Sequence, residues 1–149
     1  MLSIRLICVG KLREQFYVDA FAEYSKRLSA YCKFECIELN ETKLGASPSD
    51  KEIAAALDKE AGDIERAIGK DAYVIAMCVE GRQLKSEDFA RRINELAVSG
   101  RGRLCFVVGG SFGLSPKIKR NDLSASSCTG YARRADLPQL QNPRRIEIS

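Results

Sequence analysis

The amino-acid sequence predicts an α/β fold, a parallel sheet with helices on both faces, built as a single domain over residues 1–149. Strand-like apolar runs alternate with amphipathic stretches, which is typical of strand–helix–strand units with right-handed crossovers. The runs at 72–79 and 104–108 are apolar at almost every position, as in strands that are covered on both faces of a parallel sheet. A chain of 149 residues is also long enough to form one core without disulfides or metals.

Two further strands are predicted nearer the N-terminus. Residues 2–9 form an apolar run that Gly10 closes, and residues 34–39 alternate between apolar and polar side chains. The polar residues 40–49 then lead to the next helix. Together with the two buried runs, these segments predict a sheet of at least four strands.

Helices are predicted at residues 14–31, at 50–68 and from Ser86 onward, with a short helix at 117–122. Apolar residues recur in the long helices at steps of three and four, so each has one apolar face. Ser86 is the expected N-cap of the third helix, and two acidic residues follow it, as the helix dipole favours. The residues expected to face the core are Tyr17, Phe21, Tyr24, Leu28 and Tyr31 in the first helix, Ile53, Leu57, Ile64 and Ile68 in the second, and Phe89, Ile93, Leu96 and Ala97 in the third.

The six cysteines are expected to be free thiols of a cytoplasmic protein. Cys8, Cys78 and Cys105 lie inside apolar runs, where a thiol behaves as a small buried hydrophobe. Cys32 and Cys36 lack C-x-x-C spacing, and the chain has no histidine to complete a zinc site, so we expect no metal. No apolar run approaches the roughly 20 residues that span a bilayer, and no signal peptide is predicted, so we expect no membrane association.

The composition narrows the possible chemistry. A formal net charge of +4 is compatible with a nucleic-acid partner without requiring one. The absence of histidine excludes Ser/His/Asp and Cys/His catalytic arrangements. Neither G-x-x-x-x-G-K-[ST] nor G-x-G-x-x-G occurs, which disfavours a nucleotide-phosphate loop. What remains is group transfer from a reactive cofactor that backbone amides and apolar side chains hold in position.

The stretch FVVGGSFGLSPKIKR, residues 106–120, places three glycines directly after a buried strand. A tight turn would explain them, because glycine adopts positive φ without strain; the alternative is close approach of the backbone to a ligand. Ligands of open α/β sheets bind outside the carboxyl ends of the strands. Two segments end strands in this way, MCVEG after the third strand and GGSFGLS after the fourth.

Five stretches resemble, in order and spacing, the ribosomal large-subunit RNA pseudouridine N3-methyltransferases of the SPOUT superfamily. They are IRLICVGKLRE, FAEYSKRLSAYCKFECIEL, DKEIAAALDKEAGDIERAI, YVIAMCVEGRQLKSEDFARRI and FVVGGSFGLSPKIKR. The likeness covers residues 1–129, and its specific motifs are V-G-K-L-[RK]-E near the N-terminus and F-V-[VI]-G-G-S-x-G-L after the fourth strand.

The resemblance implies a SPOUT-type fold whose C-terminal segment threads a trefoil knot, a homodimer, and S-adenosylmethionine as the methyl donor. The implied reaction is methylation of N3 of a pseudouridine in the 23S ribosomal RNA of the assembled ribosome. Carried over by position, the cofactor would contact Met77, Gly109, Ala125, Ser126, Ser127, Cys128 and Thr129, of which the last five lie in LSASSCT, a match to L-S-x-S-x-x-T. The catalytic residue stays unassigned.

Residues 130–149 depart from the family pattern. They lack its Phe-Pro-His-Gln-Leu segment, its Arg-rich helix and its terminal Tyr-His; our hypothesis is a small deletion near Thr129 that shifted the reading frame, which the nucleotide sequence tests. In the family that helix closes the knot and packs the dimer, so we expect the chain to dimerise poorly and to transfer methyl groups weakly or not at all. The alternative function is an inactive remnant that binds RNA or a partner without methyl transfer.

Overall fold

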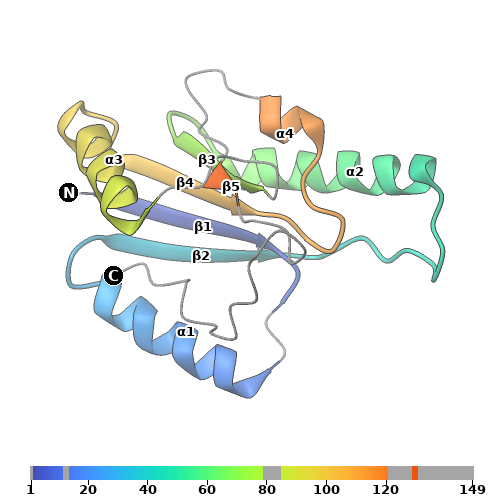
Figure 1. Cartoon of the computed structure of the whole chain (residues 1–149), viewed down its shortest axis with the longest axis horizontal. Helices are drawn as coiled ribbons and strands as arrows, with labels where there is room; N and C mark the ends of the chain where they lie inside the picture. The colour runs from blue at the N-terminus through green and yellow to red at the C-terminus, as the bar shows by residue number, and fades with distance from the viewer. Residues whose placement is uncertain (1, 12–13, 79–84, 121–128, 131–149) are drawn as a thin grey trace.

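The computed structural model describes residues 2–11, 14–78, 85–120 and 129–130. Within them, strands form one sheet in the order β2-β1-β4-β3-β5, and every neighbouring pair is parallel (Figure 1). The strands are β1 (Ser3–Val9), β2 (Lys33–Leu39), β3 (Tyr73–Cys78), β4 (Arg103–Val108) and β5 (Thr129–Gly130). The predicted parallel α/β fold is confirmed.

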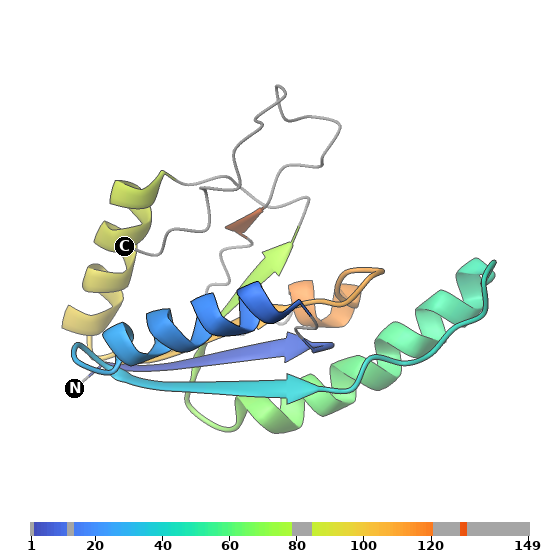
Figure 2. The ribbon, with the colours of Figure 1, turned by 90° about the horizontal axis from the view of Figure 1, so that it is seen from below.

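Helices cover both faces of the sheet (Figure 2). One face packs against α2 (Asp50–Ile68) and α4 (Pro116–Arg120), and the other carries α1 (Gln15–Leu28) and α3 (Ser86–Val98). The buried side chains are Ile7, Val9, Ala61, Ile64, Ala76, Cys105, Val107, Leu114 and Ile118 on the first face and Tyr73, Ile75, Leu96, Leu104 and Phe106 on the second. Because side chains alternate between the faces, β3 and β4 have to be apolar at nearly every position.

The second helix, α2, begins and ends where the sequence predicts. Ser49 and Glu52 form a capping box: the Ser49 hydroxyl accepts from the Glu52 N–H at 3.3 Å, and the Glu52 carboxylate accepts from the Ser49 N–H at 2.7 Å. Gly69 ends the helix with a φ of 73°, which glycine adopts without strain. Of the predicted inward residues, Ile64 is buried and the other three are partly buried. The N-terminal half of α2 projects beyond the carboxyl ends of the strands (Figure 2).

The apolar face predicted for the first helix is only partly covered, so this expectation was wrong. The helix ends before Tyr31, which is 83% exposed, and the side chains of Tyr17 and Tyr24 are also exposed. Phe21 does reach the sheet, where its ring centroid lies 6.2 Å from that of Phe34 in β2. The physical reason is position, because α1 lies against the edge strand β2 and only part of its apolar face meets the sheet.

The N-cap predicted for the third helix was also wrong by one residue. Lys85 occupies the N-cap position with extended backbone, and Ser86 is already helical. Lys85 makes no side-chain capping bond, as expected for a side chain without an acceptor. Glu87 and Asp88 lie in the first turn, where they stabilise the positive end of the helix dipole.

The short helix α4 begins directly after the glycine turn, one residue before the predicted 117–122 range. Pro116 takes its first position, where a missing N–H has no cost, and the Lys117 N–H donates to the Ser115 hydroxyl at 3.2 Å. Ile118 anchors the helix in the core, since its side chain is 2% exposed. The chain leaving the turn is therefore tied to the face of the sheet that α2 covers.

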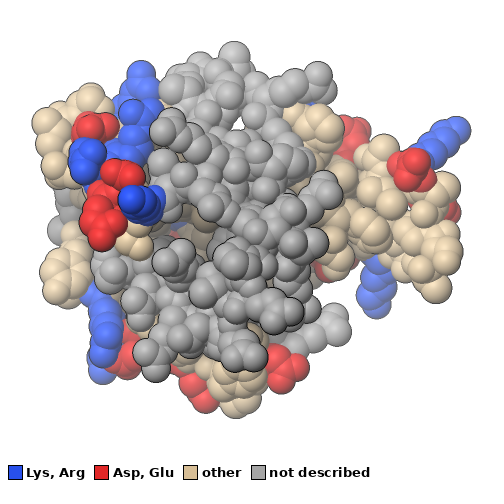
Figure 3. Space-filling model, viewed as in Figure 1, with Lys and Arg blue, Asp and Glu red and all other residues tan. Residues whose placement is uncertain are grey.

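The surface over α3 carries interspersed acidic and basic side chains, as Figure 3 shows at the left of the view. Arg91 pairs with Asp88 at 3.5 Å and Arg92 with Glu95 at 3.7 Å. Exposed pairs of this kind contribute little to stability. In the part of the chain that the structure describes, no helix is both long and apolar enough to cross a membrane.

Candidate cofactor site

Three of the predicted cofactor-binding residues lie side by side at the carboxyl edge of the sheet. Met77, near the end of β3, is paired with Val108 of β4 on one side and with Thr129 of β5 on the other. Gly109 follows Val108 directly. The other four predicted residues, Ala125, Ser126, Ser127 and Cys128, lie outside the described residues. The sheet thus brings together segments that are far apart in the sequence, while their role in binding a cofactor stays a prediction.

The glycine turn after β4 is a close backbone contact. A Cβ atom on Gly109 would lie 2.4 Å from the carbonyl oxygen of Gly113, far inside van der Waals distance. Gly113 has a φ of 82°, and its N–H donates to the Gly110 carbonyl at 3.0 Å. The tight-turn interpretation therefore accounts for Gly109 and Gly113 without a ligand.

A carboxylate that sequence analysis missed, Glu41, explains the remaining glycine. Its Oε1 accepts a hydrogen bond from the Ser111 N–H at 2.7 Å, and a Cβ atom on Gly110 would lie 2.6 Å from the same oxygen. Its Oε2 lies 3.7 Å from the position that a Cβ atom on Gly10 would take. Glu41 thus holds the loop after β2 against the ends of β1 and β4. The sequence signal that could have identified Glu41 is its position just after a strand of a parallel sheet, where functional side chains gather.

A second carboxylate, Glu60, supports the same loop from α2. It is only 6% exposed, which is unusual for a glutamate on an amphipathic helix. Burial raises the pKa of Glu60, the neighbouring Glu41 and Asp63 raise it further, and a hydrogen bond from the Thr42 backbone lowers it. Glu60 on α2 therefore lies close to the loop residues Glu41 and Thr42, and Glu41 in turn contacts the glycine turn.

The parent protein should lose stability as the pH rises through the raised pKa of Glu60, and the Glu60→Gln variant should not show this loss. Because the folded protein holds this proton more tightly than the unfolded chain, stability is fully present below the ordinary glutamate pKa of about 4.3 and is lost as the pH rises through the raised pKa of Glu60. Urea unfolding of both chains from about pH 4 to about pH 8 measures the difference. Asp58→Asn on the exposed side of α2 is the control, and identical pH profiles for the parent and Glu60→Gln chains would contradict the expectation.

Two thiols of the central strands are unsuited to nucleophilic chemistry. Burial raises the pKa of Cys8 to about 12, with a smaller contribution from the adjacent Cys36, and burial likewise raises the pKa of Cys105 to about 12. Both stay protonated at neutral pH, whereas the thiolate is the reactive form. Cys8, Cys32, Cys36 and Cys105 are all free, and the described residues contain no group of side chains that could hold a metal ion.

The edge offers apolar side chains and backbone groups to a ligand. Val108 at the end of β4 and Phe112 at the tip of the glycine turn are exposed, and Met77 is partly buried beside Val108. Glu41 adds a negative charge at the same edge. Such an edge can contact an apolar group and attract a cation, which suits a reaction whose chemistry the cofactor carries.

An all-parallel sheet with a glycine turn and a late strand at its carboxyl edge is the arrangement of α/β enzymes that bind a small cofactor there. A family model described as a predicted SPOUT methyltransferase matches residues 2–129. The chain belongs to this methyltransferase family, which confirms the predicted family and the predicted class of enzyme.

Curated relatives agree with the family match. The chain is 44% identical over 119 residues to the ribosomal RNA large subunit methyltransferase H of a Streptococcus thermophilus strain, covering 80% of this chain and 75% of that protein. The protein of the same name from Streptococcus equi subsp. zooepidemicus is 44% identical over 118 residues, 79% of this chain and 74% of the relative. That from Streptococcus uberis is 42% identical over 119 residues, 80% of this chain and 75% of the relative.

Proposed function

We propose that the carboxyl edge of the sheet is a site for S-adenosylmethionine and that its reaction is methylation of N3 of a pseudouridine in 23S ribosomal RNA, a reaction that we expect to be weak or absent in this chain because residues 130–149 depart from the family. The observation that carries the proposal is the pairing of Met77 with both Val108 and Thr129, beside the glycine turn. The substrate is suggested by the relatives above, whose names describe large-subunit ribosomal RNA methyltransferases. Because the proposed reaction acts on the assembled ribosome, we also propose that the protein works in the cytoplasm.

The residues at this edge fit the cofactor. Met77, Val108 and Phe112 supply apolar surface for the adenine ring, and Glu41 supplies a charge opposite to that of a sulfonium. S-adenosylmethionine bound there would supply an electrophilic methyl group to N3, with its thioether as the leaving group and the N3 proton lost to water. The chain itself positions the reacting groups. The hydrogen bond between Glu41 and Ser111 holds the glycine turn against the strands, so the reacting groups meet in a fixed geometry.

A homodimer is also part of the proposal, although we expect this chain to dimerise poorly because residues 130–149 depart from the family. The exposed aromatic side chains at the start of α1 support it, since Phe16 and Tyr17 lie with ring centroids 4.1 Å apart and both point largely into solvent. Exposed apolar groups that lie together mark interaction surfaces more often than scattered ones do.

We also propose that residues 1–129 form the family-like part of a single domain, with residues 130–149 as its aberrant tail and with the trefoil knot left incomplete.

Calorimetric titration with S-adenosylmethionine tests the cofactor and the tail together. We expect this chain to bind more weakly than micromolar, because residues 130–149 depart from the family. A chimera of residues 1–129 with the corresponding C-terminal segment of the Streptococcus thermophilus relative should bind the cofactor at micromolar concentration and methylate ribosomes that lack the modification. Failure of the chimera to bind would overturn the cofactor assignment, and micromolar binding by the unaltered chain would overturn the expected effect of the tail.

The inactive remnant remains the second candidate, and the same preparations separate it from the enzyme. A chain that binds RNA but transfers no tritiated methyl group would be the remnant. A chain that labels ribosomal RNA at a pseudouridine, with loss of the label when Gly109 is replaced, would be the enzyme.

A further inference from the structure

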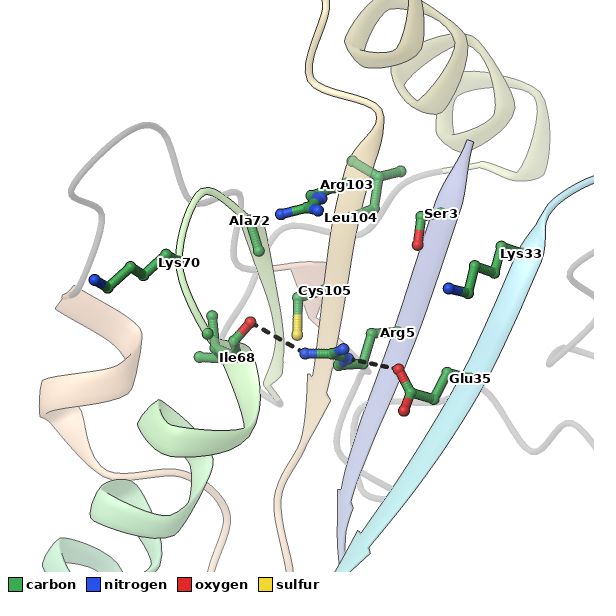
Figure 4. Close-up of a pocket in the computed structure, with 11 residues that line it drawn as sticks. Ser3, Arg5, Lys33, Glu35, Ile68, Lys70, Ala72, Arg103, Leu104 and Cys105 are labelled. Carbon is green, nitrogen blue, oxygen red and sulfur yellow. Dashed lines mark hydrogen bonds and ion pairs between the residues drawn. The ribbon is translucent and has the colours of Figure 1, made fainter. Parts of the chain in front are cut away.

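A hollow of about 230 Å³ lies at the opposite edge of the sheet, beside the amino ends of the strands (Figure 4). We call it the basic hollow, defined by Ser3, Arg5, Lys33, Glu35, Lys70 and Arg103. These residues come from three adjacent strands and from the connection between α2 and β3. Nothing in the proposed reaction uses this edge, which lies a strand length away from Met77 and the glycine turn.

Arg5 and Glu35 hold the hollow together, and their charges are already paired and not available to a ligand. The Arg5 Nε donates to Glu35 at 2.9 Å, and its Nη1 donates to the carbonyls of Ala67 at 2.8 Å and Ile68 at 3.4 Å. The guanidinium therefore neutralises the negative end of α2 and the one carboxylate of the hollow together. An anion entering the hollow is not repelled by either group.

Three cations of the hollow have no anionic partner in the described part of the chain. Among the described residues, no carboxylate lies within ion-pair distance of Lys33, Lys70 or Arg103, and all three are exposed. The register pairs Ser3 with Lys33 on one side and with Arg103 on the other, so the two cations flank one hydroxyl on the same face of the sheet. Neighbouring strands lie about 4.8 Å apart, which places the two backbones roughly 10 Å apart.

The spread of the charges favours a chain of phosphates over one small anion. Figure 4 shows Lys70 and Lys33 on opposite sides of Arg5, with Arg103 at a third point, so the three side chains do not converge on a single position. A lone phosphate would be met by one cation at a time, whereas successive phosphates of a nucleic-acid backbone can meet several. Contacts of this kind position a nucleic acid and do not read its sequence.

We propose that the basic hollow binds phosphates of the RNA backbone and holds the substrate at the edge of the sheet opposite the cofactor site. This inference rests on the proposed function, because RNA is the polyanion that the reaction requires. Lys33, Lys70 and Arg103 contact phosphates, and the Ser3 hydroxyl donates to the same group of oxygens. The hollow adds affinity and orientation without choosing the methylated base.

Salt-dependent RNA binding tests the proposal with the full chain. Binding of a labelled hairpin RNA is measured by fluorescence anisotropy over a range of salt concentrations for the parent and for the triple variant Lys33→Ala, Lys70→Ala and Arg103→Ala. Loss of three phosphate contacts should lower the slope of log K against log salt by about 2 to 3 and weaken binding by about tenfold or more. The matched control, Lys26→Ala with Lys51→Ala and Lys59→Ala, removes the same charge from exposed helix positions and should keep the parent slope.

A triple variant with the parent slope would overturn the assignment, as would a parent chain that binds no hairpin RNA. Inorganic phosphate at matched ionic strength is the second arm: full displacement of the RNA at low phosphate concentration would show a small-anion site instead. Far-ultraviolet circular dichroism should be unchanged in both variants, because every replaced side chain is exposed. If the proposed function is wrong but the hollow does bind RNA, the measurements differ. RNA binding then depends on the hollow, while the chimera neither binds the cofactor nor transfers methyl groups.

Discussion

Replacing Gly109 with alanine is expected to destabilise the protein by about 3 kcal/mol or more, at the upper end of the usual cost of overpacking. The new methyl group would lie 2.4 Å from the Gly113 carbonyl oxygen and 2.5 Å from its carbon. Both are backbone atoms, so no side-chain rotation relieves the clash, and the glycine turn would have to open. We therefore also expect S-adenosylmethionine binding by the chimera to be lost. Urea unfolding followed by circular dichroism measures the first effect and calorimetry the second.

Two other glycines provide controls for this substitution. Gly45→Ala introduces a methyl group with nothing within 4 Å, so its stability should stay within about 1 kcal/mol of the parent. Gly110→Ala should cost less than Gly109→Ala, because the clash at 2.6 Å is with the end of the Glu41 side chain, which can move. Adding Glu41→Ala to Gly110→Ala should recover part of that cost in a double-mutant cycle. A Gly109→Ala chain as stable as Gly45→Ala would refute the backbone clash.

Replacing Ile118 with alanine is expected to cost about 3 kcal/mol, within the usual range for a fully buried isoleucine. The Ile118 side chain is 2% exposed and packs in the core beneath α2, together with Ile64 and Val107. It anchors α4, which follows the glycine turn, so its loss should loosen the turn as well as the core. We expect the free energy of unfolding and the cofactor affinity of the chimera to fall together.

Val98→Ala is the matched control, because this side chain is 80% exposed at the last position of α3. Its effect on stability should stay within about 0.5 kcal/mol. Unfolding and calorimetric titration of the two variants side by side separate the role of Ile118 from a general effect of shortening an apolar side chain. Equal stability of the two variants would show that α4 does not hold the turn.

Local patterns in the sequence determined the elements of this protein. Asp50–Ile68 is helical from end to end as predicted, because Ser49 and Glu52 form a capping box at its start and Gly69 adopts a positive φ at its end. The apolar runs of β3 and β4 were equally informative, since a strand covered on both faces has no polar positions. The capping interactions join residues that are neighbours in the sequence, and the apolar runs are continuous, so the sequence by itself contains both patterns.

Tertiary structure alone decided which segments meet. The strand order places β3 between β4 and β5, which brings Met77 beside the strand that leads into the glycine turn on one side and beside Thr129 on the other. The hydrogen bond between Glu41 and Ser111 joins residues 70 positions apart, and neither position carries a local pattern that points to the other. The same holds for the exposed tyrosines of α1, whose amphipathic spacing indicates an apolar face but not how much sheet lies under it. Long-range contacts depend on the packing of the whole chain, which local periodicity does not encode.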